Sequence, residues 1–215
     1  MLGTKTDKKN IEIIKLVAQL RDHIDIHRII GLNVDSLQNS DISNAFIGYL
    51  QKAAQESLAI YFCEIFESST RNELNSISGI VDSLPQTVLA LEQRAAFFAF
   101  GKKYGNDVEP TEAKSHLKVT FGLFCGVHFS ALDRLKEFRD TIGAHSDSKA
   151  AIDSLPSHAE FETLYSFAAD FYELVSRSLI NAGPAMVPRQ AGKGLVKLIE
   201  SMGVKAPKFD FEADE

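Results

Sequence analysis

The stretch TEAKSHLKVTFGLFCGVHFSALDRLKEFRD, residues 111–140, decides the fold class. Its apolar and aromatic residues recur at alternating steps of four and three, the spacing of one face of an amphipathic helix. The residues on this face are Leu117, Phe121, Phe124, His128, Ala131, Leu135, Phe138 and Ile142. This periodicity predicts a long helix over about 111–140 that packs in an antiparallel pair.

Helical spacing continues on both sides of this stretch, and alternating strand patterns are absent from the sequence. The further predicted helices cover residues 8–30, about 41–66, a short segment after 70, residues 86–100 and a segment opened at 157. We expect Asp41 to cap the second of these helices, with Phe46 on its inward face. Two later helices begin with the spacing of capping boxes, Thr70 with Glu73 and Ser157 with Glu160. The predicted fold class is all-α, an antiparallel bundle of four to five main helices with extra N- and C-terminal helical segments.

The chain length of 215 residues suits one domain with an appendage, or at most two small domains. We expect the bundle to occupy residues 1–185. Residues 186–215 read as a linker, a short basic helix at about 194–202 and the acidic tail FDFEADE. No internal repeat is found.

Composition narrows the class of protein. The net charge of −6 excludes a protein that coats nucleic acid by neutralising phosphates, so contact with RNA has to be local or directed by shape. No apolar run approaches the roughly 18 residues that span a bilayer, and the first ten residues lack the apolar core of a signal peptide. We therefore expect a cytoplasmic protein without membrane contact. Cys63 and Cys125 form no CxxC unit, and we expect two reduced, buried thiols and no bound metal or other cofactor.

The candidate functional segment is RDTIGAHSD, residues 139–147, at the end of the long predicted helix. Arg139 supplies a planar fork of donors for phosphate, and His145 is a side chain that transfers protons near neutral pH. Gly143 can end the helix and let His145 fold back beside the last turn. An ordinary structural role explains the same residues, since an arginine complements a helix C-terminus and a loop histidine caps a carbonyl.

This segment resembles the defining motif of the HEPN superfamily, which is an arginine, a polar residue and, after a short spacer, a histidine. The sequence FRDTIGAHSD is most similar to the motif region of the abortive-infection AbiU-like branch. The sequence-specific likeness covers residues 134–148, and the helical layout around it extends the likeness to about 41–182. The resemblance implies an HEPN-like bundle that dimerises with the two motifs facing each other.

The resemblance also implies an activity. Many members are metal-independent endoribonucleases in toxin–antitoxin or phage-defence systems, whereas others only bind RNA or nucleotides. Carried over, Arg139 would hold the scissile phosphate and His145 would act as general acid and base. Asp140 would orient one of these two, and Ser146 would add a supporting hydrogen bond. The expected partners are a second copy of the chain, an RNA substrate and a cognate antitoxin or other protein.

Two alternatives stay open. The stretch 133–149 balances four cations against four carboxylates, so a non-catalytic helical module that binds RNA, a nucleotide or a protein through the same cleft is the second hypothesis. The third is an antitoxin-like or scaffold role in which the helical seam and the acidic tail only bind other chains. His23 and His27 have the one-turn spacing of zinc ligands, but Ile24 stands where a metalloprotease has its Glu, which favours a structural role. His128, alone among phenylalanines, is interpreted as a core or interface histidine.

Overall fold

The computed structural model describes residues 4–40, 43–68, 75–144, 155–180 and 190–205, and every element in these ranges is helical. The helices are α1 (Thr4–Leu32), α2 (Val34–Gln38), α3 (Asn44–Phe66), α4 (Ile77–Ser83), α5 (Leu91–Lys103), α6 (Ala113–Val127), α7 (Phe129–Ala144), α9 (His158–Val175) with the π-helical turn η1 (Ser176–Ile180), and α10 (Gln190–Ser201). No strand forms in these ranges beyond one isolated bridge between Val88 and Glu112. The predicted all-α class is confirmed.

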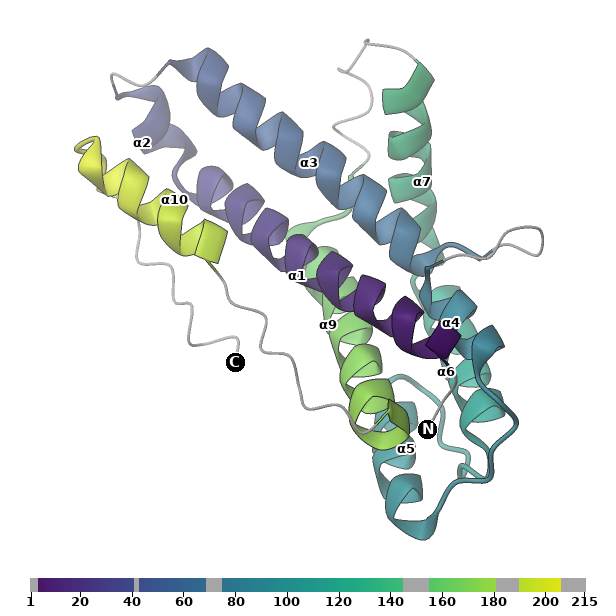
Figure 1. Ribbon diagram of the computed structural model, residues 1–215. Helices are drawn as coiled ribbons and strands as arrows, with labels where there is room; N and C mark the ends of the chain where they lie inside the picture. Colours follow the sequence, from purple (N-terminus) through teal and green to yellow (C-terminus); the bar gives the residue numbers. More distant parts are fainter. Residues whose placement is uncertain (1–3, 41–42, 69–74, 145–154, 181–189, 206–215) are drawn as a thin grey trace.

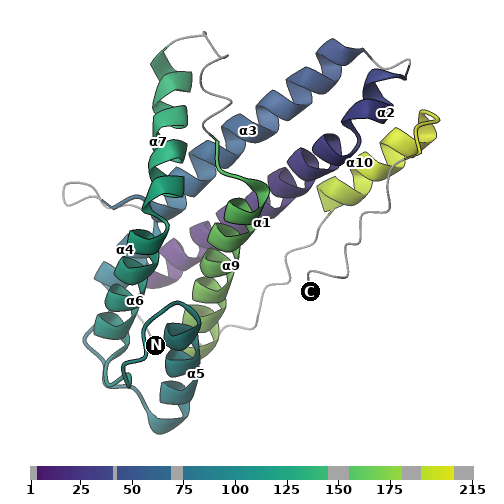
Figure 2. The ribbon, with the colours of Figure 1, turned by 180° about the vertical axis from the view of Figure 1, so that it is seen from behind.

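The long helices α1 and α3 lie side by side, and α9 packs against α1 (Figure 1). Helices α6 and α7 follow each other along one edge of the bundle, with α5 at one end of the molecule (Figure 2). One large apolar core joins these helices, and its centre is a group of stacked and tilted phenylalanine rings: Phe62, Phe66, Phe100, Phe124, Phe161 and Phe167. These aromatic contacts hold α3, α5, α6 and α9 together.

Helix α10 packs on the other end of α1 through a second, smaller apolar cluster (Figure 1). Ile199 and Val204 meet Ile29 and Ile30 of α1 there, together with Ile47 of α3. The C-terminal helix is thus attached to the bundle by its own group of contacts, separate from the phenylalanine core.

Several helix ends differ from the sequence-based expectation. The predicted helix over 111–140 is two helices that meet at His128, whose φ of −101° and ψ of 19° lie outside the helical region. The helix expected over 86–100 begins only at Leu91, because the backbone NH of Leu89 donates to the Thr111 carbonyl at 2.9 Å. This hydrogen bond between residues distant in the sequence has replaced the first turn of the predicted helix.

The capping predictions have mixed outcomes. Ser157 and Glu160 form the predicted capping box: the Ser157 NH donates to Glu160 Oε2 at 2.7 Å, and the Glu160 NH donates to Ser157 Oγ at 3.3 Å. Asp41, Thr70 and Glu73 lie outside the described residues. Helix α4 is capped by Ser76, whose Oγ accepts from the Gly79 NH at 3.2 Å.

On α3 the inward position belongs to Ile47, and the prediction for Phe46 is wrong, since its side chain is 47% exposed. None of the helices in the described ranges has the length and apolar character needed to cross a membrane.

Candidate functional site

Arg139 lies in the last turns of α7 and is held by two carboxylates. Its Nε and Nη2 donate to Asp140 Oδ1 at 3.1 and 2.9 Å, and its Nη1 donates to Glu67 Oε2, at the end of α3, at 3.4 Å. Burial opposes the positive charge, but the hydrogen bond to Asp140 and the nearby negative charges outweigh it, so the pKa of Arg139 is raised. The guanidinium is therefore always charged. Its hydrogen bond to Glu67 is the longest of the three contacts.

This guanidinium stands at the edge of a cavity of about 510 Å³ between α3, α6 and α7. The interior of the cavity is mainly apolar, with Phe66, Phe121, Cys125 and Leu132 in its wall. Lys136 and Asp133 join Arg139 at its rim. A ligand in this cavity would meet an apolar wall and, at its edge, charged side chains of both signs.

The two thiols in the cavity wall are poor nucleophiles. Both cysteines are free, as expected, with Cys63 buried and Cys125 half-buried. Burial raises the pKa of Cys63 to about 11 and that of Cys125 to about 12. At neutral pH both groups are protonated, and the thiolate is the reactive form of cysteine.

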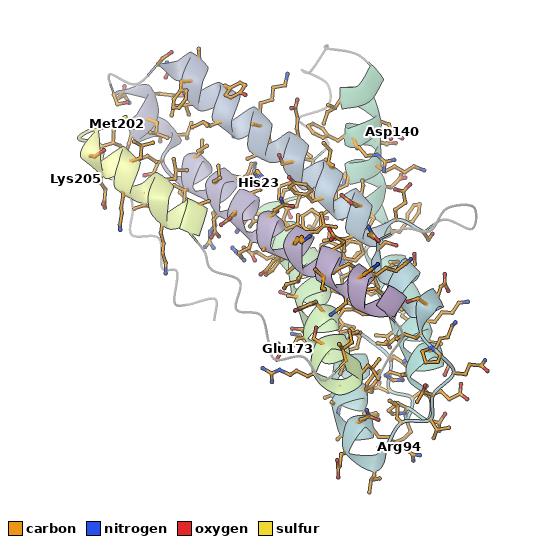
Figure 3. The ribbon with its side chains drawn as sticks, in the orientation of Figure 1. His23, Arg94, Asp140, Glu173, Met202 and Lys205 are labelled. Carbon is orange, nitrogen blue, oxygen red and sulfur yellow. The ribbon has the colours of Figure 1, made fainter. Side chains whose placement is uncertain are left out.

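The structure brings Arg139 and Asp140 together, whereas His145 and Ser146 lie outside the described residues. Helix α7 runs through Gly143 to Ala144, so the expectation that Gly143 ends the helix is wrong. Asp140 lies on α7, far from Arg94 on α5 (Figure 3).

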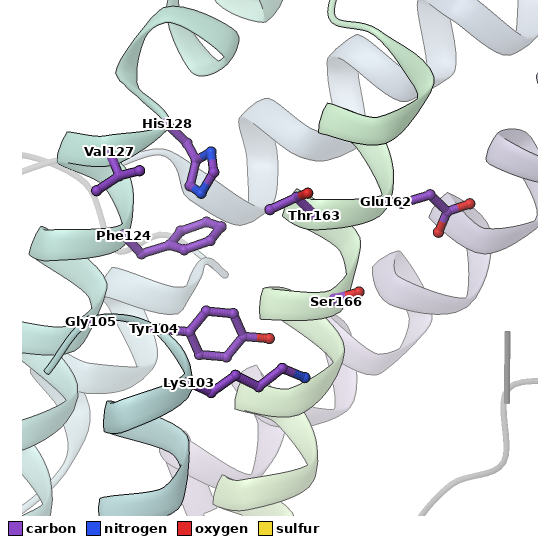
Figure 4. Close-up of a pocket in the computed structure, with 9 residues that line it drawn as sticks. All are labelled: Lys103, Tyr104, Gly105, Phe124, Val127, His128, Glu162, Thr163 and Ser166. Carbon is purple, nitrogen blue, oxygen red and sulfur yellow. The ribbon is translucent and has the colours of Figure 1, made fainter. Parts of the chain in front are cut away.

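A second cavity, of about 500 Å³, lies on the other side of α6, against α9 (Figure 4). The His128 ring contacts the Phe124 ring there at a tilt of 45°, with centroids 4.4 Å apart, so His128 is a half-exposed cavity residue rather than part of the core. Tyr104 donates to Asp170 Oδ2 at 2.7 Å, and Lys103 Nζ donates to the same oxygen at 2.6 Å. Burial and the bond to Asp170 raise the pKa of Tyr104 above its ordinary value. Lys103 and Tyr104 in the wall of this cavity are thus both engaged by Asp170.

A buried ion cluster, which the sequence analysis missed, ties α1 to α9. Arg21 Nη2 lies 2.6 Å from Asp25 Oδ1, and Arg21 Nη1 lies 2.7 Å from Glu162 Oε2. The Arg21 and Asp25 side chains are 5% and 0% exposed. Burial alone would raise the pKa of Glu162, but His158, whose Nε2 lies 3.3 Å from Glu162 Oε1, and the hydrogen bonds from Arg21 lower it to about 2. The signal in the sequence was an Arg and an Asp one turn apart on an otherwise apolar helix face.

His23 and His27 lie among aromatic rings, beside Tyr61 and Phe161 respectively. Burial lowers the pKa of both imidazoles, and His27 Nε2 lies 3.4 Å from the amide nitrogen of Gln55. Within the described ranges, no group of three His, Cys, Asp or Glu side chains is placed to hold a metal ion.

The chain has no significant match among protein-family models, curated proteins or solved structures. The resemblance of residues 134–148 to the HEPN motif accordingly stays a prediction.

Proposed function

We propose that this chain is an HEPN-like, metal-independent endoribonuclease that acts in a phage-defence or toxin–antitoxin setting. The observation that supports it is Arg139, a permanently charged and 28% exposed guanidinium at the edge of the 510 Å³ cavity, six residues before His145. An arginine at the rim of an open cavity is suited to bind a phosphate through paired hydrogen bonds.

In this proposal a phosphate oxygen replaces Glu67 on Arg139 Nη1, because that contact is the longest of the three that hold the guanidinium. Asp140 keeps its two hydrogen bonds and fixes the orientation of the fork. Arg139 then stabilises the charge that develops on the phosphate in the transition state. His145 transfers the proton between the ribose 2′-hydroxyl and the leaving oxygen as general base and acid.

The charge of the site limits which RNA it accepts. Carboxylates at positions 67, 133 and 140 surround Arg139, so an extended phosphate backbone is repelled as much as it is attracted. We propose that the substrate is chosen by shape, as a structured loop with splayed bases such as a tRNA loop would be.

The test is cleavage of a tRNA pool by the purified protein in the presence of EDTA. Removing either a transition-state hydrogen-bond donor or a general acid–base group lowers rates by about 100-fold or more, so we expect Arg139→Ala and His145→Ala each to show this loss. Arg177→Ala is the matched control, because Arg177 is exposed on η1, lies outside the candidate site and pairs with Glu173 at 2.9 Å. Full activity of both site variants would contradict the proposal.

The second candidate function is a non-catalytic helical module that binds RNA, a nucleotide or a protein at this cleft. It is favoured by one observation: Asp140 and Glu67 already accept hydrogen bonds from all three nitrogens of the Arg139 guanidinium. Binding that survives His145→Ala, with no cleavage by the unaltered chain, would support this function over the first.

A further inference from the structure

The cavity between α6 and α9 is separate from the Arg139 site. It has a volume of about 500 Å³ and lies between the C-terminal ends of α5 and α6 and the first half of α9. Among the described residues, none lines both this cavity and the one of 510 Å³. Cavities that hold small molecules commonly measure about 300–1,000 Å³ and combine apolar walls with a few polar groups. The side chains of the wall therefore indicate which class of molecule fits.

One side of the cavity is a row of aromatic rings. Figure 4 shows His128, Phe124 and Tyr104 one after another along the side formed by α6 and α5. The His128 and Phe124 centroids are 4.4 Å apart, and Tyr104 meets Phe124 edge to face at 5.5 Å. His128 and Tyr104 are half-exposed, so parts of both rings are open to the cavity. A flat aromatic ring packs against such a row through stacked or edge-to-face contacts, with centroids about 4.5–7 Å apart.

The charged groups of the wall already have counter-ions. Among the described residues of the wall, Lys103 and Glu162 are charged. Lys103 Nζ lies 2.6 Å from Asp170 Oδ2. Both carboxylate oxygens of Glu162 accept hydrogen bonds from Arg21, at 2.7 and 2.9 Å. A charged ligand would break one of these pairs or bury a charge without a partner, and both are unfavourable, so the cavity is suited to an uncharged ligand.

Ser166 supplies a hydroxyl group that is free to bind. The hydroxyls of Thr163 and Tyr104 are already used as donors, to the Ala159 carbonyl at 2.8 Å and to Asp170 at 2.7 Å. In contrast, the Ser166 hydroxyl has no hydrogen-bond partner in the part of the chain that the structure describes. It belongs to α9, across the cavity from the aromatic row (Figure 4). A serine hydroxyl both donates and accepts, so its natural partner is another hydroxyl on the ligand.

We infer that this cavity binds a small uncharged molecule made of a flat aromatic ring that bears a hydroxyl group, the chemical class of phenols and naphthols. The ligand ring lies against His128 and Phe124, and its hydroxyl forms a hydrogen bond with Ser166. This binding involves no residue of the Arg139 site, and it holds whether or not the chain cleaves RNA.

The first experiment measures the binding of β-naphthol to the full chain by fluorescence anisotropy. The chain contains no tryptophan, and β-naphthol is excited at wavelengths longer than tyrosine absorbs, so the emission comes from the ligand alone. We expect a dissociation constant of about 1 mM or lower, as for a ligand of this size in a cavity that fits it.

Two analogues test the chemical class by competition with β-naphthol. Decahydro-β-naphthol keeps the hydroxyl but has no aromatic ring, and β-naphthoate carries a charged carboxylate in place of the hydroxyl. Each should bind at least about tenfold more weakly than β-naphthol, because the first loses the aromatic contacts and the second brings a charge without a counter-ion.

The second experiment locates the ligand with variants of the chain. Ser166→Phe fills the cavity with a ring and should raise the dissociation constant at least about tenfold. Gly122→Leu is the matched control, since Gly122 lines the 510 Å³ cavity and an added Cβ meets nothing there within 4 Å. This variant should leave the constant unchanged. Circular dichroism checks that each variant keeps its helical content.

A smaller change tests the hydrogen bond itself. Ser166→Ala removes one neutral hydrogen bond to the ligand and should weaken binding about two- to tenfold. Ser115→Ala is its control, because Ser115 is exposed on α6, lies outside the walls of both cavities and bonds only weakly to the Glu112 carbonyl, at 3.3 Å.

Four results would overturn the inference. One is the absence of measurable binding at about 1 mM β-naphthol. Another is an analogue, saturated or charged, that binds as well as β-naphthol. The third is binding that Gly122→Leu abolishes and Ser166→Phe leaves intact, since the ligand would then occupy the other cavity. The fourth is an affinity that Ser166→Ala does not change.

Discussion

Replacing Glu162 by Gln probes the buried ion cluster between α1 and α9. The Glu162 carboxylate accepts two hydrogen bonds from Arg21, at 2.7 and 2.9 Å, and its side chain is 28% exposed. The Gln amide keeps the shape and one acceptor oxygen but removes the charge. Arg21 is then left with Asp25 as its buried counter-ion.

The magnitude follows from the pKa of Glu162, which is about 2 in the folded protein against an ordinary 4.5. A carboxyl group whose pKa is lowered on folding stabilises the protein at pH values above its unfolded pKa, and this contribution is lost as the pH falls through the folded pKa. At 1.36 kcal/mol per pH unit the difference corresponds to about 3 kcal/mol, and partial solvent access reduces our expectation to about 2 kcal/mol. The contribution should be complete at pH 7 and mostly lost near pH 2.

The assay is urea unfolding followed by circular dichroism between pH 7 and pH 3. At pH 7 we expect Glu162→Gln to lower the free energy of unfolding by about 2 kcal/mol or more, because one partner of a buried ion pair is lost. On acidification the gap between the two proteins should narrow, since the unaltered chain loses the contribution that the variant already lacks.

Glu173→Gln on the same helix is the control. Glu173 pairs with Arg177 at 2.9 Å, but both side chains are about half exposed, so we expect a change below about 0.5 kcal/mol. The reasoning is refuted if Glu162→Gln shifts stability by the same amount at pH 7 and pH 3, or no more than Glu173→Gln does.

Two further predictions concern glycines and thiols. Gly101→Ala should destabilise the fold by about 1–3 kcal/mol, because the new Cβ would lie 2.5 Å from His116 Nε2 and 2.8 Å from a backbone carbonyl. Gly48→Ala, at an open position in α3, should stabilise it by about 0.5–1 kcal/mol through helix propensity; thermal unfolding measures both, and equal effects would contradict the prediction. Cys63 and Cys125, with pKa values of about 11 and 12, should react with a thiol reagent at pH 8 at least about tenfold more slowly in the folded chain than in urea. Reaction of either thiol at the unfolded rate would be inconsistent with its burial.

The helices themselves were largely predictable, because each carries its own apolar face. The 4-3 pattern correctly marked Leu117, Phe124, Leu135 and Phe138 as buried. It could not show the break at His128, since a single residue with altered dihedral angles leaves the spacing of the face unchanged. The start of α5 was mispredicted because a backbone hydrogen bond between Leu89 and Thr111 competes with helix formation.

The candidate site was predictable only in part. Asp140 is the neighbour of Arg139 in the chain, so their contact follows from the sequence alone. Glu67 approaches from 72 residues away, and no local pattern identifies it. Likewise, the sequence shows Arg21 and Asp25 one turn apart, but it does not show Glu162, 141 residues away from Arg21.

The sequence by itself determined the all-helical class and the order of the helices, because periodicity is a property of neighbouring residues. Only the tertiary structure decided which side of α6 is covered, which carboxylates surround Arg139 and where the two cavities form. These features depend on side chains that are distant along the chain and meet only when the helices pack around the phenylalanine core.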